Sequence, residues 1–355
     1  MTMTSSPAVT IVTPTKNRRV LLAETMDSVR RQTLVAWEHI IVDDGSDDGT
    51  AEVVSRRAES DPRVRYLMRT GQRTGANVCR NHGLASAAAG LIVFLDSDDM
   101  LRPHCLERRV EVMSRNADLD FAVFRAGVFI KSIGDVPRLY HDQAPGDDLL
   151  RFLSLDCIWE ISGPIWRREF LKRIGGFDEE ALSMQDLEMH VRAICSGGKY
   201  IFLRDVDHDI RGQDDSTRTS TRHFRDPAYI EAAARTWDSL FHTVKNAGLL
   251  TWSRHRAILG QNFSLAQGWI KIGRGDRATK TWAKGCGRNG TRLVWLLGLA
   301  MLLLLRCAPG DAGVVGRLVN KWKGWVRFRQ EPKPLKVEVV SETQPSYLGD
   351  PKLEK

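Results

Sequence analysis

Several signals that commonly identify a function are missing from this 355-residue sequence. Its six cysteines are scattered and form no CxxC pair, which argues against a disulfide scaffold or a zinc ribbon and suits a reducing compartment. No GxGxxG or GxxxxGKS/T loop joins a strand to a helix, so the main signal for a dinucleotide-binding or P-loop ATPase domain is absent. The charge-free apolar run at residues 293–305 has thirteen residues, whereas a bilayer span needs ~20.

The first eight residues carry neither the basic segment nor the apolar run of a secretory leader, so we expect a cytoplasmic protein. Hydrophobic residues make up 42% of the sequence and charged residues 27%, a composition that excludes wholesale disorder. At ~150 residues per domain, the length predicts about two domains.

The net charge of +8 is unevenly distributed along the chain. Residues 1–220 contain 29 basic and 34 acidic side chains, whereas residues 221–355 contain 23 basic and 10 acidic ones. A basic C-terminal part suggests an anionic partner, either nucleic acid or a membrane surface. The acidic first part argues against nucleic-acid binding by the main domain.

Short apolar segments alternate with helical ones over the first hundred residues. Strands are predicted at residues 9–13, 39–42, 64–67 and 91–95, and helices at 21–31, 50–58 and 76–88. Because the predicted strands are apolar throughout, we expect them to be buried on both faces. The sequence therefore predicts an α/β fold, with a mostly parallel central sheet and helices on both faces.

The pattern changes in the second half of the chain. It predicts a strand at 121–130 and helices at 165–175 and 187–195. From residue 227 onward only helical segments follow, at 229–245, 254–272 and 276–285. These segments predict a C-terminal helical appendage.

Polar clusters follow three of the predicted strands, at residues 13–17, 43–46 and 96–99. Ligands of parallel α/β sheets bind beyond the carboxyl ends of the strands, so these clusters form the candidate site. Asp96 and Asp98 could share one divalent cation, because hard cations such as Mg²⁺ and Mn²⁺ prefer oxygen ligands. No set of histidines and cysteines accompanies them, which argues against zinc. The alternative is an acidic turn with helix-capping aspartates.

Five motifs in order resemble one known family. They lie at residues 9–18 (VTIVTPTKNR), 41–46 (IVDDGS), 80–84 (RNHGL), 94–99 (FLDSDD) and 175–186, where GGFDE precedes Gln185 and Asp186. Together they resemble the family 2 inverting glycosyltransferases, which have the GT-A fold. The resemblance covers about residues 8–220.

The resemblance implies a nucleotide-sugar donor, which we expect to be a UDP-sugar, and a set of donor-binding residues. These are Pro14, Thr15, Asn17, Asp44, Arg80, Asn81, Asp96 and Ser97. In the family the counterpart of Asp44 contacts the uracil imide, and residues 96–98 correspond to the DxD motif. Asp98, together with Asp96, would then hold Mn²⁺ or Mg²⁺ on the diphosphate.

Asp186 resembles the catalytic base of the family. An inverting transfer requires a general base for the acceptor hydroxyl and positive charge for the leaving diphosphate, and it needs no covalent enzyme intermediate. The other use of Asp186 is to cap the helix that begins near it, and the two roles can coexist.

The sequence departs from the family pattern at three positions. Lys16 replaces a tyrosine that packs on the uracil, so it could instead meet phosphate. Gln185 replaces a glutamate before the base, which removes a neighbouring negative charge and should favour ionisation. Gln213 stands where many members have a metal-binding histidine, which leaves His208 as a displaced candidate ligand.

The basic C-terminal part combines two apolar segments. The run at 293–305 precedes aliphatic and tryptophan side chains at helical spacing in residues 313–329, and residues 292–329 contain seven basic side chains and one acidic one. Such segments resemble in-plane membrane helices, and each basic residue near an anionic leaflet contributes about 1 kcal/mol. The alternative is a helix that covers the catalytic domain with a solvated basic face.

These patterns predict four parts of the chain: a catalytic domain at 1–220, a helical region at 221–290, membrane-associating helices at 291–330 and a disordered tail at 331–355. We expect an inverting hexosyltransferase of cell-surface polysaccharide synthesis that acts on a glycan or lipid-linked acceptor. It would lie on the inner face of the cytoplasmic membrane, associated through residues 292–330 and without a nucleic-acid partner. The alternatives are a sugar nucleotidyltransferase and a catalytically silent sugar-nucleotide-binding or scaffold protein.

Overall fold

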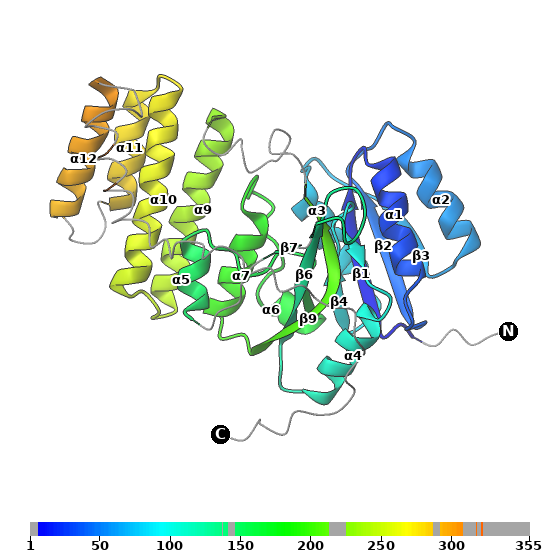
Figure 1. Ribbon diagram of the computed structural model, residues 1–355. Helices are drawn as coiled ribbons and strands as arrows, with labels where there is room; N and C mark the ends of the chain where they lie inside the picture. The colour runs from blue at the N-terminus through cyan, green and yellow to red at the C-terminus, as the bar shows by residue number, and fades with distance from the viewer. Residues whose placement is uncertain are drawn as a thin grey trace.

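The computed structural model describes residues 6–136, 138–140, 146–212, 225–286 and 292–307, together with Arg317 and Lys321. Its strands and helices form a curled mixed sheet followed by a helical layer (Figure 1). The predicted tail at 331–355, most of the predicted membrane segment beyond residue 307, and Gln213 lie outside the described residues.

The first half of the sheet is parallel. Its strands are β1 (Val9–Thr15), β2 (Trp37–Asp43), β3 (Val64–Met68) and β4 (Leu91–Phe94), and they lie in the order β3-β2-β1-β4. β1, β2 and β4 are buried almost throughout because both faces are covered, whereas the edge strand β3 is partly exposed. Along β1, for example, Ile11 faces one hydrophobic core and Val12 faces the other.

Helices cover both faces of this parallel half. The helix α3 (Ala76–Ser86) packs on one face, while α1 (Arg19–Arg30), α2 (Thr50–Ser60) and α4 (Cys105–Arg115) contribute to the other core. Gly83 lets α3 lie directly on β1, because a Cβ at this position would collide with the side chain of Val12. The predicted α/β fold with helices on both faces is confirmed.

The second half of the sheet mixes directions. The remaining strands are β5 (Met100–Leu101), β6 (Phe121–Phe129), β7 (Arg138–Leu139), β8 (Pro164–Arg167) and β9 (Tyr200–Arg211). The strand β8 joins β4 to β6 and is antiparallel to both, whereas β9 runs parallel to β6.

Two parts of this half differ from the sequence prediction. Residues 165–175 do not form one helix: Ile165 and Trp166 belong to β8, and α6 (Arg168–Arg173) begins after them. A short apolar run fits a buried strand and a helix equally well, and sheet pairing decided between them. The long strand β9 carries exposed and charged residues, so no apolar run announced it.

The helical layer contains α9 (Pro227–Asn246), α10 (Trp252–Lys271), α11 (Gly275–Cys286) and α12 (Arg292–Cys307). In Figure 1 it stands beside the sheet, next to α5 (Asp148–Leu153) and α7 (Gln185–Cys195). α9 contacts α7, and α10 contacts α5. One continuous hydrophobic cluster runs from the α3 side of the sheet into these helices, so the helical layer shares a core with the sheet.

Candidate functional site

A cleft of about 1070 Å³ collects most of the residues that the sequence singled out. Pro14 and Thr15 end β1, Asp44 follows β2, and Asp98 lies just beyond β4. The predicted residues that line the cleft are Pro14, Thr15, Asp44, Arg80, Asp96, Ser97, Asp98 and Asp186. The cleft therefore lies at the carboxyl ends of the parallel strands, where ligands of such sheets bind.

Three predicted site residues do not line this cleft. Asn17 joins two loops, because its backbone N–H donates to Ser46 (2.9 Å) and its side-chain oxygen accepts from the backbone of Asp47 (2.9 Å). Asn81 braces the turn after α6, since its amide donates to the carbonyl of Phe177 (2.9 Å) and accepts from the N–H of the same residue. Both residues support the walls of the site.

His208 is the third of these residues, and its surroundings do not suit a metal ligand. It is fully buried, with Nε2 2.6 Å from Glu160 and Nδ1 2.8 Å from Asp207. Burial alone would lower its pKa, but the two carboxylates raise it above the usual value. Both nitrogens therefore already face charged partners, Glu160 at Nε2 and Asp207 with Arg109 at Nδ1, whereas metal coordination needs a free nitrogen lone pair.

Asp207, one of the two carboxylates beside His208, belongs to a buried ionic network that the sequence did not reveal. Arg109, fully buried on α4, binds Asp207 of β9 through two hydrogen bonds of 2.7 and 2.9 Å. Burial opposes ionisation of Asp207, but Arg109 lowers its pKa to about 2. Glu160 also lines the cleft, so this network fixes one wall of the site.

The two adjacent aspartates after β2 have different roles. Asp43 is structural: it accepts hydrogen bonds from Ser46 and from the hydroxyl of Tyr66 (2.8 Å). Asp44 lines the cleft, accepts from the N–H of Gly75 (3.0 Å), and is paired with Arg69. Lys16, at the position of the missing tyrosine, lies 3.6 Å from Asp44.

Arginines balance the charges of residues 96–99. Arg18 lies 3.2 Å from Asp98, and Arg80 lies 2.7 Å from Asp96. Burial, followed by the charge of Asp96, raises the pKa of Asp98 above its usual value. Asp99 is more deeply buried and accepts a hydrogen bond from the hydroxyl of Ser162 (2.8 Å). Its pKa is strongly raised, first by burial and then by the charges of Asp98 and Asp96.

This arrangement fits a hard divalent cation. Asp96 and Asp98 offer oxygen ligands, and a cation would relieve the repulsion between them. Among the residues that the structure describes, no group of three or more His, Cys, Asp or Glu side chains could hold a metal. A site with one or two carboxylates that is completed by substrate phosphates is the usual arrangement for Mg²⁺.

Asp186 lies in the first turn of α7, and its own carboxylate accepts from the N–H of Leu187 (2.9 Å). Burial raises its pKa above the usual value, against the positive charge of Arg80. The same Arg80 donates to Gln185 (3.2 Å). One guanidinium therefore joins the aspartates after β4 to the segment that carries Asp186.

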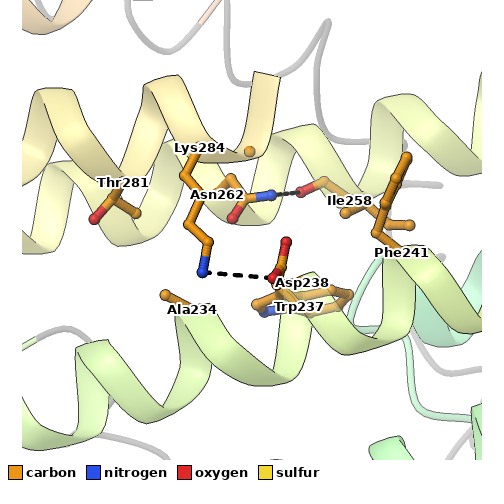
Figure 2. Close-up of a pocket in the computed structure, with 9 residues that line it drawn as sticks. Ala234, Trp237, Asp238, Phe241, Ile258, Asn262, Thr281 and Lys284 are labelled. Carbon is orange, nitrogen blue, oxygen red and sulfur yellow. Dashed lines mark hydrogen bonds and ion pairs between the residues drawn. The ribbon is translucent and has the colours of Figure 1, made fainter. Parts of the chain in front are cut away.

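A second, smaller cavity lies within the helical layer. It measures about 20 Å³ and is bordered by Trp237, Asn262 and the ion pair between Lys284 and Asp238 (3.4 Å), as Figure 2 shows. This volume holds about one water molecule, so the cavity is a packing gap and not a ligand site.

Comparisons with known proteins agree with the motifs. Residues 10–159 match the family model described as glycosyl transferase family 2. The chain is 37% identical over 107 residues to the glycosyltransferase TuaG of Bacillus subtilis, which is assigned to teichuronic acid biosynthesis; the match covers 30% of this chain and 42% of TuaG. It is 36% identical over 132 residues to the GalNAc(5)-diNAcBac-PP-undecaprenol beta-1,3-glucosyltransferase of Campylobacter jejuni. This match covers 37% of this chain and 41% of the glucosyltransferase. The chain thus spans about two fifths of these relatives.

Solved structures share the fold over most of the chain. The structure of TarS residues 1–349 from S. aureus with UDP-GlcNAc has a TM-score of 0.60, 19% identity and 79% coverage of each chain. The mannosyltransferase PcManGT from Pyrobaculum calidifontis, in complex with GDP-Man and Mn²⁺, has a TM-score of 0.52 and 19% identity, covering 91% of this chain and 85% of that one. At this identity the likeness establishes a GT-A-like fold.

Proposed function

Because residues 10–159 belong to glycosyl transferase family 2, we propose that this protein transfers a sugar from a nucleotide donor, a UDP-sugar, to a hydroxyl group. The acceptor is a glycan or a lipid-linked saccharide, and the product is a cell-surface polysaccharide. The similarity to TuaG and to the undecaprenol-linked glucosyltransferase supports this acceptor class.

The main support for this proposal is the position of Arg80, which links Asp96 to Gln185. This side chain, only 5% exposed, contacts Asp96 on one side and Gln185 on the other, 105 residues further along the chain than Arg80 itself. It thereby holds the donor motif beside the candidate base Asp186. A donor phosphate site next to a buried carboxylate is what direct transfer to an acceptor hydroxyl requires.

In the proposed reaction Asp186 takes the proton of the acceptor hydroxyl while that oxygen attacks the anomeric carbon from the face opposite the leaving group. Attack from this face inverts the configuration in one step, without a covalent intermediate. A divalent cation held by Asp96 and Asp98 would supply positive charge to the leaving diphosphate. Arg18 and Arg80, which neutralise these aspartates in the free protein, are then available to the phosphates.

A panel of UDP- and GDP-sugars with Mn²⁺ tests the proposal directly. Without an acceptor, water replaces the acceptor hydroxyl, so we expect slow hydrolysis of at least one UDP-sugar. The hydrolysis should stop when EDTA removes the cation. Absence of hydrolysis across the panel, or hydrolysis that EDTA leaves unchanged, would contradict the proposed metal-dependent reaction.

The pairing of Arg18 with Asp98 gives a prediction about the metal alone. In Arg18→Gln the cation no longer competes with a guanidinium for Asp98, so we expect free protein to bind Mn²⁺ more tightly. An ion pair at this exposure is worth up to about 1 kcal/mol, which corresponds to up to about a five-fold change in affinity. Binding of UDP should weaken in the same variant, because a phosphate counter-charge is lost.

Electron paramagnetic resonance of Mn²⁺ and calorimetry with UDP measure these two affinities. Arg19→Gln is the matched control, because it removes the neighbouring guanidinium, which does not line the cleft. If Arg18→Gln binds Mn²⁺ no more tightly than the control does, the proposal that a cation displaces Arg18 from Asp98 is wrong.

We also propose that the C-terminal part associates with the inner face of the cytoplasmic membrane. Among the described helices none is long and apolar enough to cross a bilayer. The helix α12 packs against Trp282 through Gly298 and exposes one apolar face made by Leu296, Leu297, Leu303 and Leu304. An exposed leucine face followed by a basic segment suits an in-plane position on an anionic membrane.

Replacing these four leucines by glutamine should reduce binding to phosphatidylglycerol-containing vesicles at least ten-fold, because each buried leucine contributes about 1.5–3 kcal/mol. The side chains are exposed, so the fold should persist. Val20→Gln with Val35→Gln removes exposed apolar side chains from the sheet domain and serves as the control. Equal partition of the leucine variant and the control in vesicle sedimentation would refute membrane association through α12.

A further inference from the structure

Part of the cleft wall comes from the helical layer. Tyr229, Ala233 and Trp237 of α9 and Gln261 and Leu265 of α10 line the same cleft as the donor motifs. None of these residues belongs to the segment that matches the family model. This part of the wall is therefore a feature of this chain that the donor motifs do not explain.

Gln261 is the unusual member of this wall. Its side chain is 2% exposed, and its amide nitrogen donates to the carbonyl of Leu153 at 3.4 Å. Because a carbonyl only accepts, the amide cannot be turned over without losing this bond. Its oxygen is left with no hydrogen-bond partner among the residues that the structure describes. A buried acceptor without a donor is costly, so such a group requires an explanation.

Two other features belong to the lining of the same cleft. Ser183, also 2% exposed and part of the lining, has a hydroxyl without a partner within the described ranges. Leu155 and Met184 line the cleft with backbone φ angles of +61° and +56°, which side chains other than glycine rarely adopt. Strained backbone of this kind persists where the surrounding structure holds it, commonly at ligand sites.

We infer that this wall is the acceptor subsite and that Gln261 accepts a hydrogen bond from a hydroxyl or amide N–H group of the acceptor sugar. The inference rests on the proposed transferase function and names a part of its substrate site. The unpartnered oxygen requires a donor, and hydroxyl groups supply one. Leu155, Ile161 and Leu265 line the same cleft and offer apolar surface to the C–H face of a sugar ring.

Binding of octyl glycosides to the UDP-loaded, Mn²⁺-containing full chain tests the subsite. We use octyl β-glycosides of glucose, galactose and N-acetylglucosamine as probes, and saturation-transfer NMR as the measurement. At least one glycoside should bind the wild-type protein, and Gln261→Met should weaken that binding about ten-fold, the effect of about one lost buried hydrogen bond. Gln267→Met, on the same helix but outside the cleft lining, should bind as the wild type does.

Thermal unfolding of the ligand-free chain gives an independent test. Methionine removes the unsatisfied oxygen of Gln261 but also the 3.4 Å hydrogen bond to Leu153, so Gln261→Met should leave the melting temperature within about 2 °C of the wild type. Gln32 is the matched control, because its amide makes three hydrogen bonds, to Ser28, Arg102 and Leu106. Gln32→Met should lower the melting temperature.

Each outcome decides the inference. A Gln261→Met protein whose melting temperature falls as far as that of Gln32→Met shows that the amide is already satisfied within the protein, and the inference is then wrong. It is also wrong if no glycoside binds the wild type, or if Gln261→Met binds as tightly. Hydrolysis of nucleotide sugars by the wild type tests the proposed function separately, so hydrolysis together with unchanged glycoside binding would refute the acceptor subsite alone.

Discussion

Asp186→Asn is expected to slow sugar transfer by about 100- to 10,000-fold, the usual contribution of a general base. Asparagine preserves the shape of the side chain and can still accept the hydrogen bond from Leu187, so α7 should keep its start. The variant cannot take the proton of the acceptor hydroxyl. Because Asp186 is not a ligand of the nucleotide in this scheme, the affinity for UDP should change little.

The pH profile of the wild-type protein follows from the same residue. In the proposed reaction Asp186 acts only when ionised, and burial raises its pKa above the usual value of 3.8. As the pH is lowered, the transfer rate should therefore begin to fall at a higher pH than it would if Asp186 were a solvated aspartate. This acidic limb should be absent from the residual activity of Asp186→Asn.

The thermal stability of Asp186→Asn gives a second check, because it should change in the opposite direction to the activity. A carboxyl group whose pKa is raised by folding stabilises the native state below its unfolded pKa, and this stabilisation is lost as pH rises through the folded value. At neutral pH Asp186→Asn should therefore unfold at a higher temperature than the wild type while it loses activity. Near pH 3 the difference should vanish. An active variant, or one that is less stable at neutral pH, would contradict the role of a buried base.

Asp98→Ala is expected to reduce transfer by about 100- to 1,000-fold, comparable to the loss of one strong electrostatic contact to the transition state. Asp98 lines the cleft directly after β4, and its carboxylate is partnered by Arg18. Without it the cation loses a ligand, and the leaving diphosphate loses its counter-charge. Mn²⁺ binding and activity should therefore fall together.

The control for Asp98→Ala is Asp47→Ala. Asp47 is an exposed aspartate of the loop after β2 that does not line the cleft, so its loss should change neither quantity. Titration with Mn²⁺, monitored by paramagnetic resonance and by turnover, measures both proteins. Full transfer activity in Asp98→Ala would remove Asp98 from the metal site.

The sequence predicted the parallel half of the fold because this half is encoded locally. β1, β2 and β4 are largely buried segments that each end in a polar cluster, so the edge that carries the site could be located in advance. The aspartates after β4 follow a predicted strand in the same way, whereas Asp186, at the start of α7, was singled out only by the resemblance to the family. Eight of the eleven residues that the sequence assigned to the site line the cleft.

The sequence by itself therefore indicated the family resemblance, predicted the α/β fold and singled out the carboxylates that line the cleft. Only the tertiary structure decided how these carboxylates are neutralised and what completes the cleft. The contacts between Arg18 and Asp98, Arg109 and Asp207, and Gln261 and Leu153 each join residues 80 or more positions apart. No local pattern encodes such pairs, because each forms only when elements that are distant in the sequence pack side by side. The same packing buried His208 between Asp207 and Glu160, so this residue does not line the cleft, where the resemblance to the family had suggested it as a displaced metal ligand.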